Sequence, residues 1–159
     1  MMVATIREAA ADDAATLVRL VHEFEREEGK SAARLTVADV LAQGFGERPR
    51  FRVLLAEDAG QTLGYAMFYP SYDSEHAARG LYLQDLFVVP EARGRGVGRA
   101  LMAAVARACQ ADGGCYLFWN ALEANHAGRA FYRRLGAREE PVVTLSLQPD
   151  ALRRLAAQA

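Results

Sequence analysis

The sequence predicts an α/β protein in which helices surround one mixed, mostly antiparallel sheet. Segments with helical apolar spacing and short β-branched or aromatic segments follow one another in the order β α α β β β α β α β, with a tail helix. A chain of 159 residues, 52% hydrophobic and 25% charged, is long enough for one core. No repeat, linker or low-complexity stretch divides it. We therefore expect a single domain over residues 1–159.

The chain is expected to begin with an edge strand over 3–8 and a helix capped by Asp12 or Asp13. The helix has an apolar stripe at positions i, i+3, i+4 and i+7, formed by Leu17, Leu20, Val21 and Phe24. Its far end carries four glutamates, Glu23, Glu25, Glu27 and Glu28. Acidic residues are unfavourable at that end of a helix dipole, which indicates another use, such as binding a cation.

The middle of the chain is predicted to form a hairpin and the central strand. A loop over 29–35 and a short helix over 36–43, capped by Thr36, come first. The strands are expected at 51–57, at 62–69 before Pro70, and at 81–89 before Pro90, with a turn over 58–61 and a polar loop over 71–80.

The last third is predicted to hold a long helix from Val97 to the glycines after Asp112. A strand over 116–120, a helix over 125–135 closed by Gly136, a strand over 142–147 and a short tail helix from Pro149 complete the order.

A glycine-rich loop lies between the central strand and the long helix. It reads Arg93-Gly94-Arg95-Gly96-Val97-Gly98-Arg99. Glycines at the start of a helix let backbone N–H groups approach an anion, and the helix N-terminus attracts negative charge. The loop lacks the Gly-Lys-Ser/Thr ending of a Walker loop, and Arg99 stands where the dinucleotide-binding fingerprint has glycine. The pattern is typical of a different phosphate or pyrophosphate cradle.

This loop resembles the acetyl-CoA pyrophosphate loop of the GCN5-related N-acetyltransferase (GNAT) superfamily, Arg/Gln-x-x-Gly-x-Gly/Ala. Arg93, Gly96 and Gly98 fill its fixed positions. Within the superfamily the chain is most similar to the spermidine/spermine (diamine) N-acetyltransferase group, over nearly its whole length. The similar stretches are Ile6-Arg7, residues 44–47, 64–67, 82–88 and 93–98, Asn125, residues 130–132 and Gly136-Ala137.

The resemblance implies a GNAT fold, splayed at the central strand, that binds acetyl-CoA. The implied cofactor-binding residues are Leu86, Phe87, Val88, Arg93, Gly94, Arg95, Gly96, Val97, Gly98, Arg99, Asn125 and Tyr132. A backbone N–H near Phe87 would polarise the acetyl carbonyl. Tyr132 would protonate the leaving thiolate, whose thiol has a pKa of about 8.5.

The resemblance also implies a base that removes a proton from the acceptor amine, because an alkylamine has a pKa of about 10.4. The diamine group has a glutamate where this chain has Gln84, and an amide is a poor proton acceptor. Asp85 is adjacent, but strand alternation points it to the other face unless the strand bulges. Three readings remain: a water chain from Asp85, Asp73 or an acid near Glu28, a less basic substrate, or a slow enzyme that binds a neutral amine.

The acceptor site implied by the resemblance contains Glu28, Asp73, Asp85, Trp119 and Asn120. We expect an N-acetyltransferase that acts on a small cationic, diamine-like amine by direct attack in a ternary complex. The alternatives are an enzyme for a lysine-like or thialysine-type amino acid or a peptide N-terminus, and a non-catalytic acyl-CoA-binding module.

Composition and charge limit the classes of molecule that we expect this chain to bind. A net charge of −1 does not favour nucleic acid, and the apolar runs are too short to span a bilayer. The N-terminus lacks the pattern of a signal peptide, and Cys109 and Cys115 have no metal-like spacing. We expect a cytoplasmic protein without a metal, and a homodimer supported by the apolar strand over 142–147.

Overall fold

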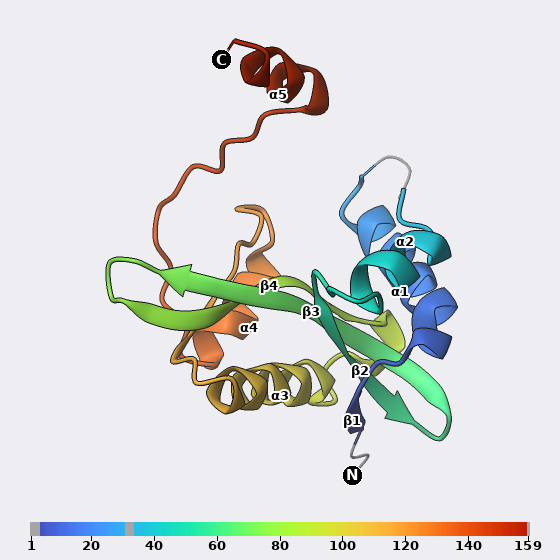
Figure 1. The fold of residues 1–159 in the computed structure, drawn as a ribbon. Helices are drawn as coiled ribbons and strands as arrows, with labels where there is room; N and C mark the ends of the chain where they lie inside the picture. Colours follow the sequence, from blue (N-terminus) through green and yellow to red (C-terminus); the bar gives the residue numbers. More distant parts are fainter. Residues whose placement is uncertain (1–3, 31–33, 159) are drawn as a thin grey trace. The chain divides into compact units, whose positions relative to one another are not determined.

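The structure, a computed structural model, describes residues 4–30 and 34–158 (Figure 1). Its five-stranded open sheet has the order β1-β2-β3-β4-β5, in which only β4 and β5 are parallel. The strands are β1 (Thr5–Glu8), β2 (Arg52–Asp58), β3 (Gln61–Asp73), β4 (Ala78–Val88) and β5 (Tyr116–Phe118). The predicted α/β class with a mostly antiparallel sheet is confirmed.

The helices follow the predicted spacing closely. They are α1 (Ala14–Glu27), α2 (Val37–Gly44), α3 (Val97–Ala111), α4 (His126–Arg134) and α5 (Pro149–Ala156), with short 3-10 turns η1 (Ala11–Asp13) and η2 (Pro90–Ala92). The chain forms two compact units, residues 1–120 and 121–159. The whole sheet and α1 to α3 belong to the first unit, and α4 and α5 to the second.

In the first unit, α1 and α2 cover one face of the sheet, while Figure 1 shows α3 on the opposite face. The predicted stripe of α1 faces the sheet: Leu17 and Leu20 are fully buried in one cluster with Tyr65, Met67 and Phe87. Cutting such a buried leucine back to alanine typically costs about 2–5 kcal/mol of unfolding free energy. Nearer the C-terminal end of α1, the ring of Phe24 lies 5.6 Å from the ring of Phe87 in β4.

The end of α1 is closed by a Schellman motif. Gly29 has a left-handed φ of +70°, and its N–H donates to the carbonyl of Arg26 at 3.1 Å. The N–H of Lys30 donates to the carbonyl of Glu25 at 3.0 Å. These are the two hydrogen bonds that define the motif, and glycine is favoured at its left-handed position. The motif fixes the backbone from which Glu28 and Lys30 project.

A β-bulge interrupts the central strand. Met67 of β3 pairs with Asp85, whereas the next residue, Phe68, pairs with Leu83, so Gln84 is the additional residue in β4. A bulge changes the direction of the side chains that follow it. Leu83 therefore pairs with Phe68 on the α3 face, while Asp85, only two residues later, lies on the α1 face with Met67 and Tyr65. The sequence did not decide whether the strand bulges here, and the structure shows that it does.

The sheet is also splayed, as the resemblance predicted. β5 pairs with Gly80, Leu81 and Tyr82 of β4 and then ends at Phe118, whereas β4 continues to Val88. Among the residues that the structure describes, no strand pairs with this edge of β4 beyond Tyr82. The edge can hydrogen-bond an extended ligand as a further strand would.

Two predicted elements are wrong. Pro70 does not end β3, which continues to Asp73, because pairing with β2 stops at Phe68 and β3 has an open edge there. The segment 142–147 forms no strand. Its backbone finds no partner strand among the described residues, and a strand needs one to satisfy its N–H and C=O groups. Residue 3 of the predicted first strand and residues 31–33 of the predicted loop lie outside the described ranges.

Candidate active site

A buried tyrosine and an aspartate form a hydrogen-bonded pair on the α1 face of the sheet. Tyr65 of β3 is fully buried, and its hydroxyl donates to Oδ2 of Asp85 at 3.1 Å. Burial raises the pKa of Asp85 to about 6, although the bond from Tyr65 and the charge of Lys30 act to lower it. Because a base works best when its pKa lies near the working pH, this carboxylate suits proton transfer near neutrality.

The end of α1 places further charges near this pair. Glu28 Oε2 lies 2.5 Å from Nζ of Lys30, and this ammonium lies 5.9 Å from the centre of the Phe24 ring. Its pKa is raised chiefly by the hydrogen bond to Glu28, and also by the charges of Asp85 and Glu25. The charges of Glu28 and Glu25 in turn raise the pKa of Asp85. Three carboxylates and one ammonium thus interact at the α1 face of β4.

Gln84 and Asp85 stand in different environments. Gln84 is exposed at the bulge, whereas Asp85 is partly buried and bonded to Tyr65. Of these two neighbours, the carboxylate is the one that is bonded on the α1 face of the sheet.

The glycine-rich loop forms the N-terminal end of α3. Gly94 and Gly96 have left-handed φ angles of +74° and +85°, and Gly96 is the residue that precedes the helix. The first helical backbone bond after it runs from the N–H of Ala100 to the carbonyl of Gly96 at 3.0 Å. The N–H groups of the first helical turn have no acceptor within the helix. Left-handed glycines before such a turn make an anion-binding concavity.

Arg93 ties this loop to α1 and β4. Its Nη1 and Nη2 donate to the two carboxylate oxygens of Glu27, each at 2.6 Å, and its Nε donates to the carbonyl of Val88 at 2.9 Å. The guanidinium also lies 5.7 Å from the centre of the Phe87 ring. The acidic end of α1 thus binds two cations of the chain itself, Arg93 and Lys30, which accounts for its unfavourable position in the helix dipole.

Asp73 lies at the other end of the hairpin. It pairs with Ala78 next to the turn, and its carboxylate bonds to Nδ1 of His76 at 2.6 Å. The ladder position of Asp85 is six residues away, a distance of about 20 Å along a strand. The structure therefore does not bring Asp73 next to Asp85. Asp73, His76 and Glu75 also form an exposed carboxylate–histidine group, a type of surface cluster that is common without a metal ion.

Four further predicted residues lie at the end of the first unit and in the second. Trp119, partly buried, and Asn120, exposed, follow β5. Asn125 caps α4, and its Oδ1 accepts a hydrogen bond from the N–H of Gly128 at 2.9 Å. Tyr132 lies in α4, its ring centre 5.2 Å from that of Phe131. Their roles in binding and catalysis stay predictions.

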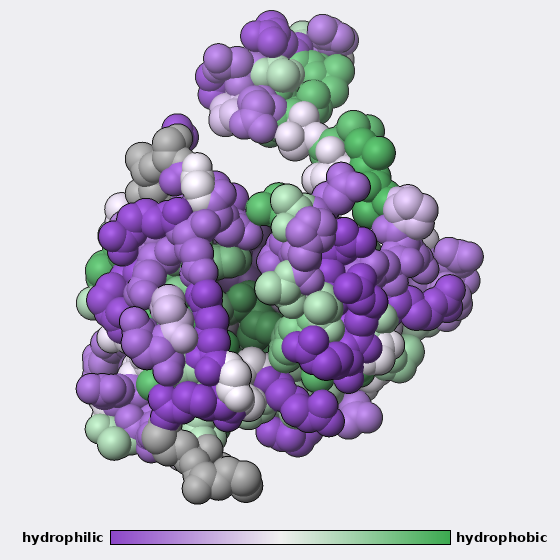
Figure 2. All heavy atoms as spheres, turned by 180° about the vertical axis from the view of Figure 1, so that it is seen from behind, coloured by the Kyte–Doolittle hydropathy of each residue, from purple (hydrophilic) through white to green (hydrophobic). Residues whose placement is uncertain are grey.

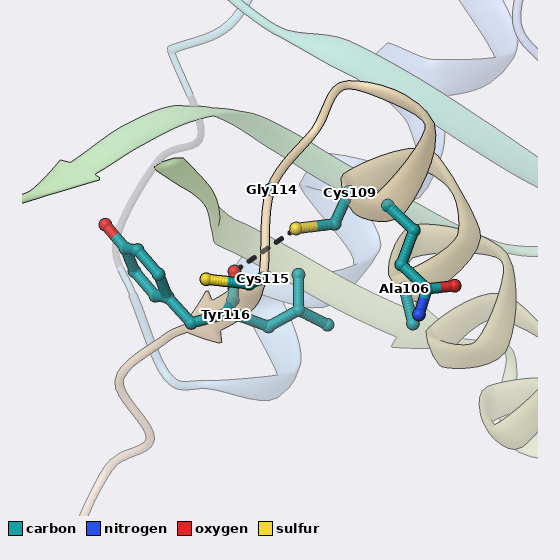
Figure 3. Close-up of a pocket in the computed structure, with 7 residues that line it drawn as sticks. Ala106, Cys109, Gly114, Cys115 and Tyr116 are labelled. Atoms are coloured by element: carbon teal, nitrogen blue, oxygen red, sulfur yellow. Dashed lines mark hydrogen bonds between the residues drawn. The ribbon is translucent and has the colours of Figure 1, made fainter. Parts of the chain in front are cut away.

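A separate hollow lies where α3 meets the start of β5 (Figure 3). Its lining includes Cys109, Gly114 and Cys115 but no charged side chain. The Cys109 thiol donates to the carbonyl of Tyr116 at 3.3 Å, drawn as the dashed line in Figure 3. None of the predicted site residues lines this hollow, so we do not assign the chemistry to it.

The sequence analysis missed three residues of the charged cluster: Tyr65, Lys30 and Glu25. Lys30 had a signal in the composition, because it is the chain's only lysine. Tyr65 had none, since its pairing with Asp85 depends on the register of β3 against β4 and on the bulge. Glu25 was noted only as part of an acidic run.

Several known proteins are similar to this chain. The sequence pattern of the acetyltransferase (GNAT) family matches residues 16–137. A thialysine N-epsilon-acetyltransferase of Sus scrofa is 33% identical over 95% of this chain and 96% of its own. A human spermidine/spermine N(1)-acetyltransferase-like protein 1 is 34% identical over 76% of this chain, which spans 19% of that protein.

A solved structure shows the same fold. It is an integron cassette protein from the mobile metagenome of V. cholerae, with a TM-score of 0.82 and 27% identity over 98% of this chain and 99% of its own. Within the described residues, no helix combines the length and the apolar character that crossing a membrane requires.

Proposed function

We propose that this chain, which belongs to the acetyltransferase (GNAT) family and is an acyl-CoA-dependent N-acyltransferase, moves an acetyl group from acetyl-CoA to a small cationic amine. The relatives named for thialysine and for spermidine/spermine support an acceptor with an alkylamine. The observation that carries the proposal is Asp85, a partly buried carboxylate with a pKa of about 6 next to the acidic end of α1.

Asp85 is proposed as the base. At pH 7.4 only about one alkylamine in a thousand is neutral, because its pKa is about 10.4. Asp85 accepts a proton from the ammonium, directly or through water, and the free nitrogen attacks the acetyl carbonyl. The C–N bond forms, the C–S bond breaks, and the CoA sulfur leaves as a thiolate. Tyr132 is proposed to give this sulfur a proton. The attacking nitrogen loses its second proton as the amide forms, and this proton restores the hydroxyl of Tyr132 through water.

The bulge supports Asp85 over Gln84 for this role. It places Asp85 on the face of Tyr65 and α1, where burial and the neighbouring carboxylates raise its pKa. An amide at position 84 cannot act as a base near neutral pH, and here it is exposed at the bulge. A base at Asp85 would allow an active enzyme even though Gln84 stands where the diamine group has a glutamate.

Acetyl-CoA is proposed to bind along the open edge of β4 and on the loop before α3. The edge from Leu86 to Val88 has the backbone groups to pair with an extended pantetheine arm. The pyrophosphate suits the first turn of α3 and the left-handed glycines before it. Arg93 supports this arrangement by holding the loop to Glu27 and Val88. Asn125 is proposed as a further contact to the CoA arm.

A homodimer is proposed on the basis of the segment before α5. Val143, Leu145 and Leu147 alternate along this segment and are 84%, 87% and 53% exposed. Figure 2 shows the apolar side chains (green) gathered along the stretch that leads to α5. Alternating apolar residues in an extended chain are typical of a strand with one buried face. A second copy of the chain is the proposed partner.

The test is acetyl transfer measured by thiol release and by the mass of the product, with a panel of alkylamines. We expect Asp85→Asn to lower kcat by about 100-fold or more, since general bases contribute about 10²–10⁴. Gln84→Ala should change kcat little. Asparagine keeps the shape of Asp85 and can still accept a bond from Tyr65, so folding is preserved. The proposal fails if Asp85→Asn stays active while Gln84→Ala is inactive.

A further inference from the structure

Lys30 is unusual in this chain because it is its only lysine. Of the 19 lysine and arginine residues, 18 are arginines. This single alkylammonium lies 5.9 Å from the ring of Phe24, which is 5.6 Å from the ring of Phe87. Phe87 in turn lies beside Tyr65, whose hydroxyl donates to Asp85, the proposed base. A lysine and an arginine differ in the way they meet a ligand, because the ammonium is a compact, movable point charge on a flexible stem.

The backbone of Lys30 is fixed, whereas the end of its side chain is accessible. The Schellman motif holds its N–H to the carbonyl of Glu25, and its ammonium is held by Glu28. The side chain of Lys30 is 56% exposed, compared with 18% for Glu28. The side chain of Lys30 is therefore more accessible to a ligand than that of Glu28.

The cluster therefore has two poles. Asp85, Glu25 and Glu28 supply negative charge, and the ammonium of Lys30 supplies positive charge at the accessible end. Tyr65, which is neutral, closes the buried side by its bond to Asp85. A purely acidic site would favour any polycation, but this site contains one charge that repels a second ammonium.

We propose that Lys30 is a specificity-determining residue that selects an amino acid with a terminal amine over the diamine of the same length. This inference rests on the proposed function. The reacting amine of either acceptor approaches Asp85. The carboxylate of the amino acid then pairs with the ammonium of Lys30, whereas a diamine has only a second ammonium, which Lys30 repels and which competes with it for Glu28.

Two acceptors that differ by a single carboxylate test this proposal. L-lysine and cadaverine have the same carbon chain between their amines, and only lysine carries the carboxylate. Thialysine and bis(2-aminoethyl) sulfide form a second pair of this kind. The variant Lys30→Met removes the charge at nearly constant length, and Lys30→Arg keeps the charge as the matched control.

We expect the wild-type protein to prefer the amino acid in kcat/KM. Lys30→Met should raise KM for the amino acid and lower KM for the diamine, each by up to about fivefold, which is the upper end of the range for an exposed charge pair. Lys30→Arg should keep the wild-type order. The effect of Lys30→Met on each of the two KM values should become smaller at high salt, because salt screens the interactions between exposed charges.

Lys30→Met is expected to change KM in opposite directions for the amino acid and the diamine, and this distinguishes a role in specificity from a purely structural role. Loss of stability or of general positioning would change both acceptors in the same direction. If Lys30→Met leaves the ratio of the two kcat/KM values unchanged, or changes both alike, the inference is wrong while the proposed function stands. If the wild-type protein acetylates no alkylamine although it binds acetyl-CoA, the proposed function fails and this inference fails with it.

Discussion

The hydrogen bond between Tyr65 and Asp85 predicts how a single hydroxyl sets the pH dependence of this enzyme. Tyr65→Phe removes the hydroxyl and keeps the ring, which is fully buried and lies 6.3 Å from the ring of Phe87. The bond stabilises the ionised form of Asp85, so its removal raises the pKa of the carboxyl. The variant should therefore lose activity on the acid side and keep it on the alkaline side.

The size of the effect follows from the energy of the bond. A hydrogen bond to a charged group contributes about 1.5 kcal/mol at the lower end of its range, close to one pKa unit. The pKa of Asp85 then moves from about 6 to about 7. At pH 6 the ionised fraction falls from about one half to about one eleventh, a loss of about fivefold, whereas at pH 8 it falls by less than about 10%.

The assay is kcat/KM between pH 5 and 8 for both proteins, expressed as the ratio of variant to wild type. The ionisation of the acceptor amine is the same in both and cancels in this ratio. Tyr69→Phe is the matched control, because Tyr69 lies in the same strand and stacks on Tyr82 with ring centres 5.1 Å apart. A flat ratio across this pH range, or an equal shift in Tyr69→Phe, refutes the argument that Tyr65 acts on Asp85.

Three further predictions concern the loop, acid stability and assembly. Glu27→Gln should raise KM for acetyl-CoA and cost less than about 1 kcal/mol of unfolding free energy in a denaturant titration, because its pair with Arg93 is half exposed. Arg7 bonds to Asp13 and lowers the pKa of that carboxyl from 3.8 to about 2. The resulting stability is present above pH 3.8 and lost as pH falls through 2, so Asp13→Asn should flatten the unfolding free energy over this range. Leu145→Asp should shift a dimer to monomer in sedimentation; an unchanged dimer would contradict the role of this segment.

Local patterns predicted much of the fold. The stripe of α1, the capping box of Thr36 with Asp39, and the start of α3 after Gly96 depend on residues a few positions apart, and all three are present. The glycine-rich loop before α3 was found for the same reason. Glycines and arginines close together in sequence need no knowledge of the sheet.

The features that the sequence did not predict depend on contacts between distant segments. Period-two alternation could not decide the face on which Asp85 lies, because alternation contains no information on the bulge at Gln84. The partner of Tyr65 is 20 residues away and follows only from strand register. The strand over 142–147 has the right pattern, but a pattern cannot supply the neighbouring strand with which it must pair.

The central claim is that Asp85 is the base of an alkylamine acetyltransferase. The most direct measurement is release of CoA thiol with acetyl-CoA and L-lysine or cadaverine, with the acetylated product identified by mass, for wild-type protein and Asp85→Asn. We predict one thiol for each acetylated amine in the wild type, an acid limb near pH 6, and at least about 100-fold slower turnover in Asp85→Asn with acetyl-CoA still bound. Equal turnover in the two proteins, with no limb near pH 6, would contradict the claim.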